Sequence, residues 1–231
     1  MRGILILAAV TGAAAAAVSP AWAAERSFTV TSFEEIEVAG PFDVVVNVGK
    51  GQSVRAVGDA DDLDRLKVEV SGRELRIGSK ERRWTDWSRS EPIKIWITVP
   101  ALRAASIAGS GDMQIDRVKG DSFAASIAGS GDLTVATLST TNANFSVAGS
   151  GDLTASGSCR AAKVSIAGSG DVNIGGLRCQ SLNASIAGSG AINANATEAA
   201  KLSVMGSGDI TVSGGAKCDV SKMGSGSVRC G

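Results

Sequence analysis

Ser106-Ile107-Ala108-Gly109-Ser110-Gly111-Asp112 is the first of a series of related segments that fills the second half of this chain. Gly-Ser-Gly triplets begin at residues 109, 129, 149, 168, 188, 206 and 224, so successive triplets are 18 to 20 residues apart. A fixed period of this length is typical of repeat architectures, in which each unit buries its apolar side against its neighbours. The sequence therefore predicts a stack of similar units.

Apolar and polar residues alternate on both sides of each triplet, which indicates strands rather than helices. Parallel neighbours need a connection of about a dozen residues or more, and one circuit of an 18- to 20-residue coil supplies it. We therefore predict an all-β protein in which residues 101–231 form a parallel β-solenoid of about seven coils, with equivalent positions stacked about 4.8 Å apart. The position two before each triplet predicts a buried ladder of Ile107, Ile127, Val147, Ile166, Ile186 and Val204. Lys222 takes this position in the last unit, which predicts a polar end to the stack.

Residues 24–100 also alternate apolar and polar side chains, but without the repeat. Strands are expected at 28–30, 36–38, 42–48, 66–70 and 93–99, because Gly- or Pro-containing breaks separate these runs. The one expected helical turn is at 59–66, where acidic residues come first. This segment is predicted to be a largely antiparallel β region that packs with the solenoid as one unit.

The first 23 residues have the pattern of a secretory signal peptide. Arg2 precedes a short apolar run, and Ala21-Trp22-Ala23 supplies the small residues of a cleavage site. No second apolar run follows, so no membrane span is expected in the mature chain. The expected location is the periplasm, the cell surface or the extracellular space.

The composition excludes several kinds of chemistry. The chain has no His and no Tyr, which removes Ser-His-Asp and Cys-His catalysis and every His-ligated metal site. Its 23 basic and 23 acidic residues balance, which argues against nucleic acid as a partner, because phosphate binding needs a basic surface. We expect no cofactor and no bound metal.

A column of carboxylates is expected along the stack, from Asp112, Asp132, Asp152, Asp171 and Asp209, with Ala191 interrupting it. A Ca²⁺ column is one interpretation, but calcium-binding solenoids place a Gly-rich turn every nine residues. The favoured interpretation is that each Asp accepts backbone N–H groups of its own turn. Clustered Asp residues also occur in polysaccharide-cleaving solenoids, which leaves a carboxylate-based enzyme as the least favoured alternative.

Two further sets of side chains suggest sites. The segment 81–89 mixes Trp and Arg, which are frequent in binding hot spots, and paired Trp side chains can stack on sugar rings. The candidate binding residues are Arg82, Arg83, Trp84, Trp87 and Arg89, although the favoured interpretation of this segment is a hairpin tip whose Trp residues cover an edge of the β region. The four Cys residues allow three pairings, of which equivalent positions on adjacent coils and symmetry about the last turn favour Cys159–Cys179 and Cys218–Cys230.

A strip of small side chains is the last regular feature. Ser stands three before every triplet, at 106, 126, 146, 165, 185, 203 and 221, and Ala stands one before the first five triplets. Uniformly small residues permit close approach, so we expect a packing surface for the N-terminal region or for a second molecule. The alternative is that these side chains face inward in a narrow coil.

Three features of the chain form a recognisable set: the opening 33–44, the lead-in Ile97-Thr98-Val99-Pro100-Ala101-Leu102, and the Ser-Ile-Ala-Gly-Ser-Gly-Asp repeats. In these segments the chain resembles the bacterial family of putative auto-transporter adhesins with a head GIN domain. The resemblance implies an exported β-solenoid joined to an antiparallel β region, and it implies no catalytic residue. The expected function is a non-enzymatic structural or adhesin-like interaction module of the cell envelope, with an envelope protein or a glycan as partner. The alternatives are a carbohydrate-binding module that uses Trp84 and Trp87 and, less favoured, the carboxylate-based polysaccharide enzyme.

Overall fold

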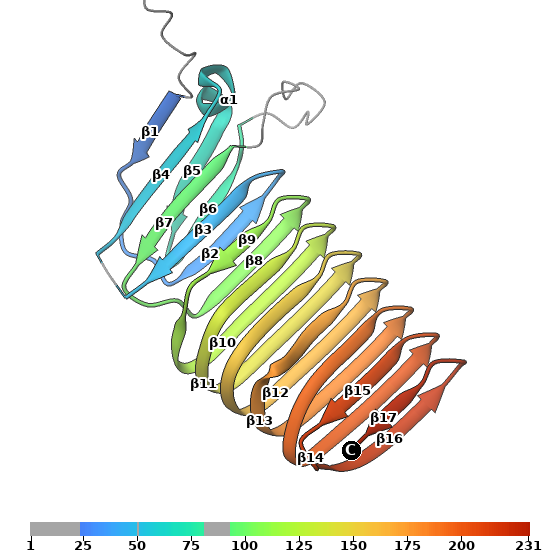
Figure 1. Cartoon of the computed structure of the whole chain (residues 1–231). Helices are drawn as coiled ribbons and strands as arrows, with labels where there is room; N and C mark the ends of the chain where they lie inside the picture. The colour runs from blue at the N-terminus through green and yellow to red at the C-terminus, as the bar shows by residue number, and fades with distance from the viewer. Residues whose placement is uncertain (1–23, 50, 81–92) are drawn as a thin grey trace, which may run out of the picture.

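The computed structural model describes residues 24–49, 51–80 and 93–231. Within these residues seventeen strands form one hydrogen-bonded sheet that winds into a solenoid, as Figure 1 shows. The signal-peptide pattern at residues 1–23 lies outside the described residues and stays a prediction.

The first part of the chain contains eight elements. These are β1 (Ala24–Phe28), β2 (Glu35–Ala39), β3 (Asp43–Val48), β4 (Ser53–Gly58), α1 (Ala60–Arg65), β5 (Leu66–Ser71), β6 (Glu74–Ser79) and β7 (Lys94–Val99). The repeat part continues with β8 (Ala104–Gly109), β9 (Met113–Ile115), β10 (Val118–Gly129), β11 (Leu133–Gly149), β12 (Leu153–Gly168), β13 (Val172–Gly188), β14 (Ala191–Gly206), β15 (Asp209–Ser213), β16 (Lys217–Met223) and β17 (Val228–Cys230).

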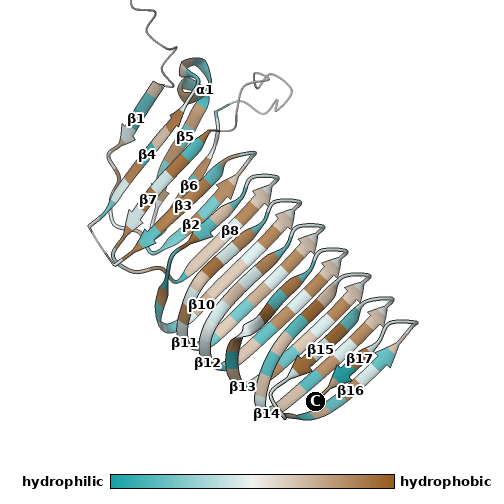
Figure 2. Cartoon of the chain, in the orientation of Figure 1, coloured by the Kyte–Doolittle hydropathy of each residue, from teal (hydrophilic) through white to brown (hydrophobic). Residues whose placement is uncertain are grey.

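The repeat forms a parallel β-solenoid of about six turns, in which each coil pairs in register with the next. Ile127 pairs with Val147, Val147 with Ile166, and Ile166 with Ile186. All six residues of the predicted aliphatic ladder are buried, with no more than 2% of any of them exposed. The bands of apolar and polar residues that alternate along the strands in Figure 2 are this in-and-out pattern. The predicted stacking register is therefore confirmed.

The triplets make one corner of every coil, and two of their residues must be Gly for different reasons. The first Gly of a triplet, such as Gly149 (φ +135°), has a positive φ that side chains with a Cβ rarely adopt. The third Gly lies against the previous coil: a Cβ on Gly151 would be 2.1 Å from the carbonyl oxygen of Gly131. The triplet thus allows the coils to stack at strand spacing through a sharp bend.

The antiparallel strands lie at the start of the stack. β1 pairs with β4, β4 with β7, and β5 with β6, all antiparallel. The parallel stack nevertheless reaches further back than residue 101, because β6 and β7 pair in parallel with β2 and β3, which in turn pair with β8 and β9. The coil made of β2 and β3 is thus inserted between two coils that follow it in the sequence.

The corner between β2 and β3 explains this insertion. Val38 pairs with Ile107 and Val44 with Met113, so Gly40-Pro41-Phe42 stands where the repeats have Gly-Ser-Gly. Gly40 has the same positive φ (+142°) as the first Gly of the triplets. One cluster of buried apolar residues includes side chains from Phe33 to Val212, in both the first region and the repeats.

The helix α1 lies at the same end of the molecule as the antiparallel strands (Figure 1). It forms where acidic residues predicted a helical turn. The Asp59 side chain accepts the backbone N–H of Asp61 at its start, and Leu63 is buried.

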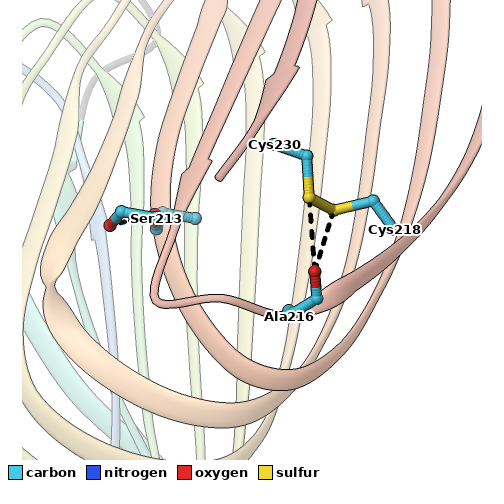
Figure 3. Close-up of a disulfide and its surroundings, with 5 residues drawn as sticks. Ser213, Ala216, Cys218 and Cys230 are labelled. Atoms are coloured by element: carbon cyan, nitrogen blue, oxygen red, sulfur yellow. Dashed lines mark hydrogen bonds between the residues drawn. A yellow bond between two sulfur atoms is a disulfide. The ribbon is translucent and has the colours of Figure 1, made fainter.

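The C-terminal end has an exposed Lys222 in the ladder position beside the exposed Val220 and Met223, and it is closed by a disulfide. Lys222 continues the aliphatic ladder next to Val204 but is exposed, and its Nζ donates to the carbonyl oxygen of Gly226 at 2.9 Å. Cys218 and Cys230 are bonded across the last turn, and both sulfurs lie against the carbonyl oxygen of Ala216, at 3.8 and 3.5 Å (Figure 3). A second disulfide joins Cys159 to Cys179, which are directly paired on adjacent coils. Both pairings are those that the coil positions predicted.

Candidate functional site

The strip of Ser and Ala side chains faces outward. Ala108, Ala128, Ala148, Ala167 and Ala187 are all exposed, and the Ser residues three before each triplet are exposed or half-buried. Met205 and Met223 continue the Ala row on the last coils, with 60% and 71% of their surface exposed. The inward alternative is therefore wrong, because the aliphatic ladder takes the inward positions and period-2 alternation sends its neighbours out.

Within residues 24–49, 51–80 and 93–100, the N-terminal region does not pack on the face of this strip. β2 instead extends the strip within the sheet, since Glu37 pairs with Ser106 and Ala39 with Ala108. The prediction that the N-terminal region packs on the face of the strip is therefore wrong, because β2 pairs with the edge of β8 and extends the sheet instead.

A hollow of about 360 Å³ lies over the strip, and its lining includes Ser126, Asn144, Ser146, Lys163 and Ser165. The Ser and Ala side chains of the strip carry no charge, and Lys163 places one cation beside them.

The Asp column forms, but its hydrogen bonds differ from the expected ones. The Asp112 carboxylate accepts the backbone N–H of Asp132 at 3.0 Å, and Asp132 accepts that of Asp152 at 2.9 Å. Each carboxylate therefore bonds the next coil rather than its own turn, because in-register stacking places the equivalent N–H directly beside it. These bonds offset the repulsion between neighbouring carboxylates.

Ala191 shows what the carboxylate does in this column. Its own N–H still donates to Asp171, at 2.7 Å, but it offers no side-chain acceptor to the following coil. The backbone N–H of Asp209 donates instead to the carbonyl oxygen of Gly190, at 3.2 Å. Among the described residues, no group of three or more Cys, Asp or Glu side chains is arranged to hold a metal ion.

Asp209 closes the column and predicts a pH effect on the last coil. The Ser227 hydroxyl, and then the Ser227 backbone N–H, hydrogen-bond to the carboxylate and lower the pKa of Asp209. Since the folded pKa lies below the unfolded value, this stabilisation is present above about pH 4 and is lost as the pH falls through the folded pKa. We expect the difference in denaturant midpoint between the wild type and Asp209→Asn to shrink from pH 7 to about pH 2.5.

The control for this effect is Asp121→Asn, an exposed carboxylate with no hydrogen bond to any part of the chain that the structure describes. Its midpoint should differ little from the wild type at either pH. An Asp209→Asn difference that stays constant with pH would contradict the assignment.

The Trp- and Arg-containing segment lies outside the described residues. The binding role of Arg82, Arg83, Trp84, Trp87 and Arg89 stays a prediction, and the sequence places them between β6 and β7.

A pocket that the sequence reasoning missed lies on the outer face of β1, β3, β4 and β7. It has a volume of about 500 Å³, and its lining includes Trp96, Arg55, Asn47 and Thr98. In the sequence, Trp96 falls within the expected strand 93–99 and carries no motif of its own. Its position among outward residues of β7, between the inward Ile95 and Ile97, was the available signal.

No helix within the described residues is long and apolar enough to cross a membrane.

Comparison with known proteins agrees with this architecture. The model of the family described as "Putative auto-transporter adhesin, head GIN domain" matches residues 32–216. A search of curated proteins gives no match. Among solved structures, the chain is similar to a putative adhesin from Bacteroides fragilis, with 26% identity and a TM-score of 0.80 over 89% of this chain and 95% of that chain. It is also similar to a putative lipid binding protein from Parabacteroides distasonis, with 25% identity and a TM-score of 0.71 over 91% of this chain and 97% of that chain.

Proposed function

Because the chain belongs to the family of putative auto-transporter adhesins with a head GIN domain, we propose that it is a non-enzymatic, adhesin-like interaction module exported to the bacterial cell envelope. The observation that carries this proposal is the outward Ser/Ala strip, which repeats without change over five coils. Solvated outward positions usually vary among charged and polar residues. A face kept small and uncharged is suited to a partner that approaches closely.

We assign an envelope protein as the partner of the strip. The exposed Met205 and Met223 at one end give a protein surface two flexible apolar side chains to pack against. At the other end the strip meets Glu37 and Arg76, which are paired with each other at 3.2 Å. An apolar end, a neutral middle and a charged end together give a protein partner a defined direction along the strip.

Two features support export and the absence of catalysis. The signal-peptide pattern of residues 1–23 agrees with the two disulfides, which persist in oxidising compartments. The carboxylates of Asp112, Asp132, Asp152 and Asp171 each accept a backbone N–H from the next coil. Carboxylates used as structural acceptors in this way are poor candidates for the acid and base of a glycosidase.

The double variant Ser146→Arg/Ser165→Arg tests the strip. Two long charged side chains in the middle of the strip should abolish partner binding while leaving the inward core unchanged. Cross-linking in intact cells, followed by mass spectrometry, should lose the contacts that the wild type makes through the strip. A matched control is Thr134→Arg/Thr154→Arg, which places the same charges on the other outward face of neighbouring coils.

The proposal fails if the strip variant keeps the partners, the oligomeric mass and the stability of the wild type. It also fails if both Arg variants lose the same cross-links, because the strip would then have no special role.

A further inference from the structure

We infer that the pocket around Trp96 is a binding site for a neutral oligosaccharide. This site lies on a different outward face from the Ser/Ala strip and does not depend on the function proposed for the strip. It is also distinct from the sugar-binding role expected for Trp84 and Trp87, because it is built from residues of β1, β3, β4 and β7.

The pocket is built on paired strands, which hold its side chains in fixed places. Ser27 pairs with Arg55, Arg55 with Trp96, and Trp96 with Val45, forming one row across the sheet. Ser53, Thr98 and Asn47 form the next outward row on three of the same strands. Sites on strands are held more rigidly than sites on loops, so the pocket is preorganised for a ligand.

Trp96 provides the aromatic surface of the pocket. Its side chain is half-buried, and the Arg55 guanidinium lies over the ring, 4.6 Å from the ring centre. This cation–π contact restrains the ring and occupies one of its two faces. A restrained, partly exposed indole is suited to packing against the C–H face of a sugar ring, since it combines a large apolar area with little conformational freedom to lose.

The polar side chains around the ring are available for hydrogen bonds. Within the described residues, the side chains of Ser27, Asn47, Ser53 and Thr98 make no hydrogen bond to the protein. Hydroxyl and amide groups can both donate and accept, as the hydroxyl groups of a sugar do. Gln52, at the border, is held by a bond from its Nε2 to the carbonyl oxygen of Thr31 at 2.5 Å.

The charge of the pocket favours a neutral ligand. Among the described residues that line the pocket, Arg55 is the one that carries a charge, and Glu25 pairs with it at 3.3 Å. A phosphate or a polyanionic ligand would need more cations than this. The volume of about 500 Å³ is within the range of small-molecule pockets. The lining combines two aromatic side chains, Phe28 and Trp96, with several uncharged hydrogen-bonding groups, and this mixture matches the chemistry of a sugar.

The same outward row continues along the solenoid with further hydrogen-bonding side chains. From Trp96 and Val45 it passes, coil by coil, to Gln114, Thr134, Thr154, Asn173, Asn193 and Thr211. A linear row of amides and hydroxyls leading away from the pocket favours an extended oligosaccharide over a single sugar.

The test measures binding of three neutral hexasaccharides, maltohexaose, cellohexaose and laminarihexaose, to the purified protein by titration calorimetry. At least one should bind the wild type. Trp96→Ala should weaken that binding by about tenfold or more, as expected for an aromatic anchor. Asn47→Ala/Thr98→Ala should weaken it several-fold without touching the core, and it keeps the test decisive if Trp96→Ala does not fold.

Three controls separate this site from the others. Asn183→Ala removes an exposed amide from the strip side of a distant coil, outside the row that leads from the pocket. Trp84→Ala/Trp87→Ala removes the other paired Trp residues, and Ser146→Arg/Ser165→Arg alters the strip. All three should keep the wild-type affinity. If Ser146→Arg/Ser165→Arg binds the sugar normally, the pocket and the strip act independently. The inference about the pocket can then fail or hold without deciding the function proposed for the strip.

The inference is overturned if none of the hexasaccharides binds the wild type. Binding that survives both pocket variants, or that is lost in Trp84→Ala/Trp87→Ala instead, would equally overturn it. Phosphatidylcholine vesicles are the remaining probe: if they bind the wild type and the pocket variants lose that binding while sugars do not bind, the pocket is a lipid site.

Discussion

Gly151→Ala is expected to destabilise the middle of the solenoid by about 3 kcal/mol or more. The new Cβ would be 2.1 Å from the carbonyl oxygen of Gly131 and 3.0 Å from Cγ2 of Ile127. The nearest atom belongs to the backbone, so no side-chain rotation can relieve the clash. Two coils must move apart at this corner, and each loses packing along the shared core.

Ser150→Ala is the matched control for Gly151→Ala. Ser150 is exposed at the tip of the same corner, so its loss should change the free energy of unfolding by no more than about 0.5 kcal/mol. Urea unfolding followed by circular dichroism measures both variants. If Gly151→Ala unfolds at the wild-type midpoint, the predicted clash with the carbonyl oxygen of Gly131 does not occur and the prediction is wrong.

Ile166→Ala is expected to cost about 2–5 kcal/mol, because it removes a fully enclosed side chain from the centre of the aliphatic ladder. Ile166 is 1% exposed and pairs with Val147 on one side and Ile186 on the other. Its neighbours belong to stacked coils whose backbones are hydrogen-bonded in register, so they cannot collapse into the cavity.

Ser165→Ala, on the same strand but pointing outward, should change stability little. Amide hydrogen exchange would show which strands Ile166→Ala destabilises. Protection should drop more in β11, β12 and β13 than in β3 or β7, because each coil contacts mainly its neighbours. Equal stability of Ile166→Ala and wild type would refute the ladder.

The sequence by itself determined the solenoid, because the pattern that predicts it lies within about 20 residues and recurs in every coil. Every coil carries the same alternation around the same triplet, and in-register stacking follows from aligning these triplets. The pairing Cys159–Cys179 followed from the same alignment, since equivalent positions on adjacent coils lie one strand spacing apart.

The sequence contains a partial signal that β2 and β3 form a coil of the stack, and the sequence analysis missed this signal. Val38-Ala39-Gly40 and Asp43-Val44 match Ile107-Ala108-Gly109 and Asp112-Met113 position by position, with Pro41-Phe42 replacing Ser-Gly. A search for the Gly-Ser-Gly triplet alone could not find this coil. Its insertion between β6–β7 and β8–β9 was not readable at all, because sequence order does not tell which strand edge a segment joins.

Only the tertiary structure decided which side chains become surface features. The alternation of apolar and polar residues predicts that the Ser and Ala side chains lie on the same side of the strand. Only the burial of the aliphatic ladder shows that this side is the outer one. The direction of the Asp hydrogen bonds depends on the N–H of the next coil, about 20 residues away in the sequence. The pocket around Trp96 brings together residues of four strands, from Ser27 to Thr98, whose proximity exists only after antiparallel and parallel pairing at the start of the stack. Local patterns therefore determined the repeating core, and contacts between segments distant in the sequence determined the candidate sites.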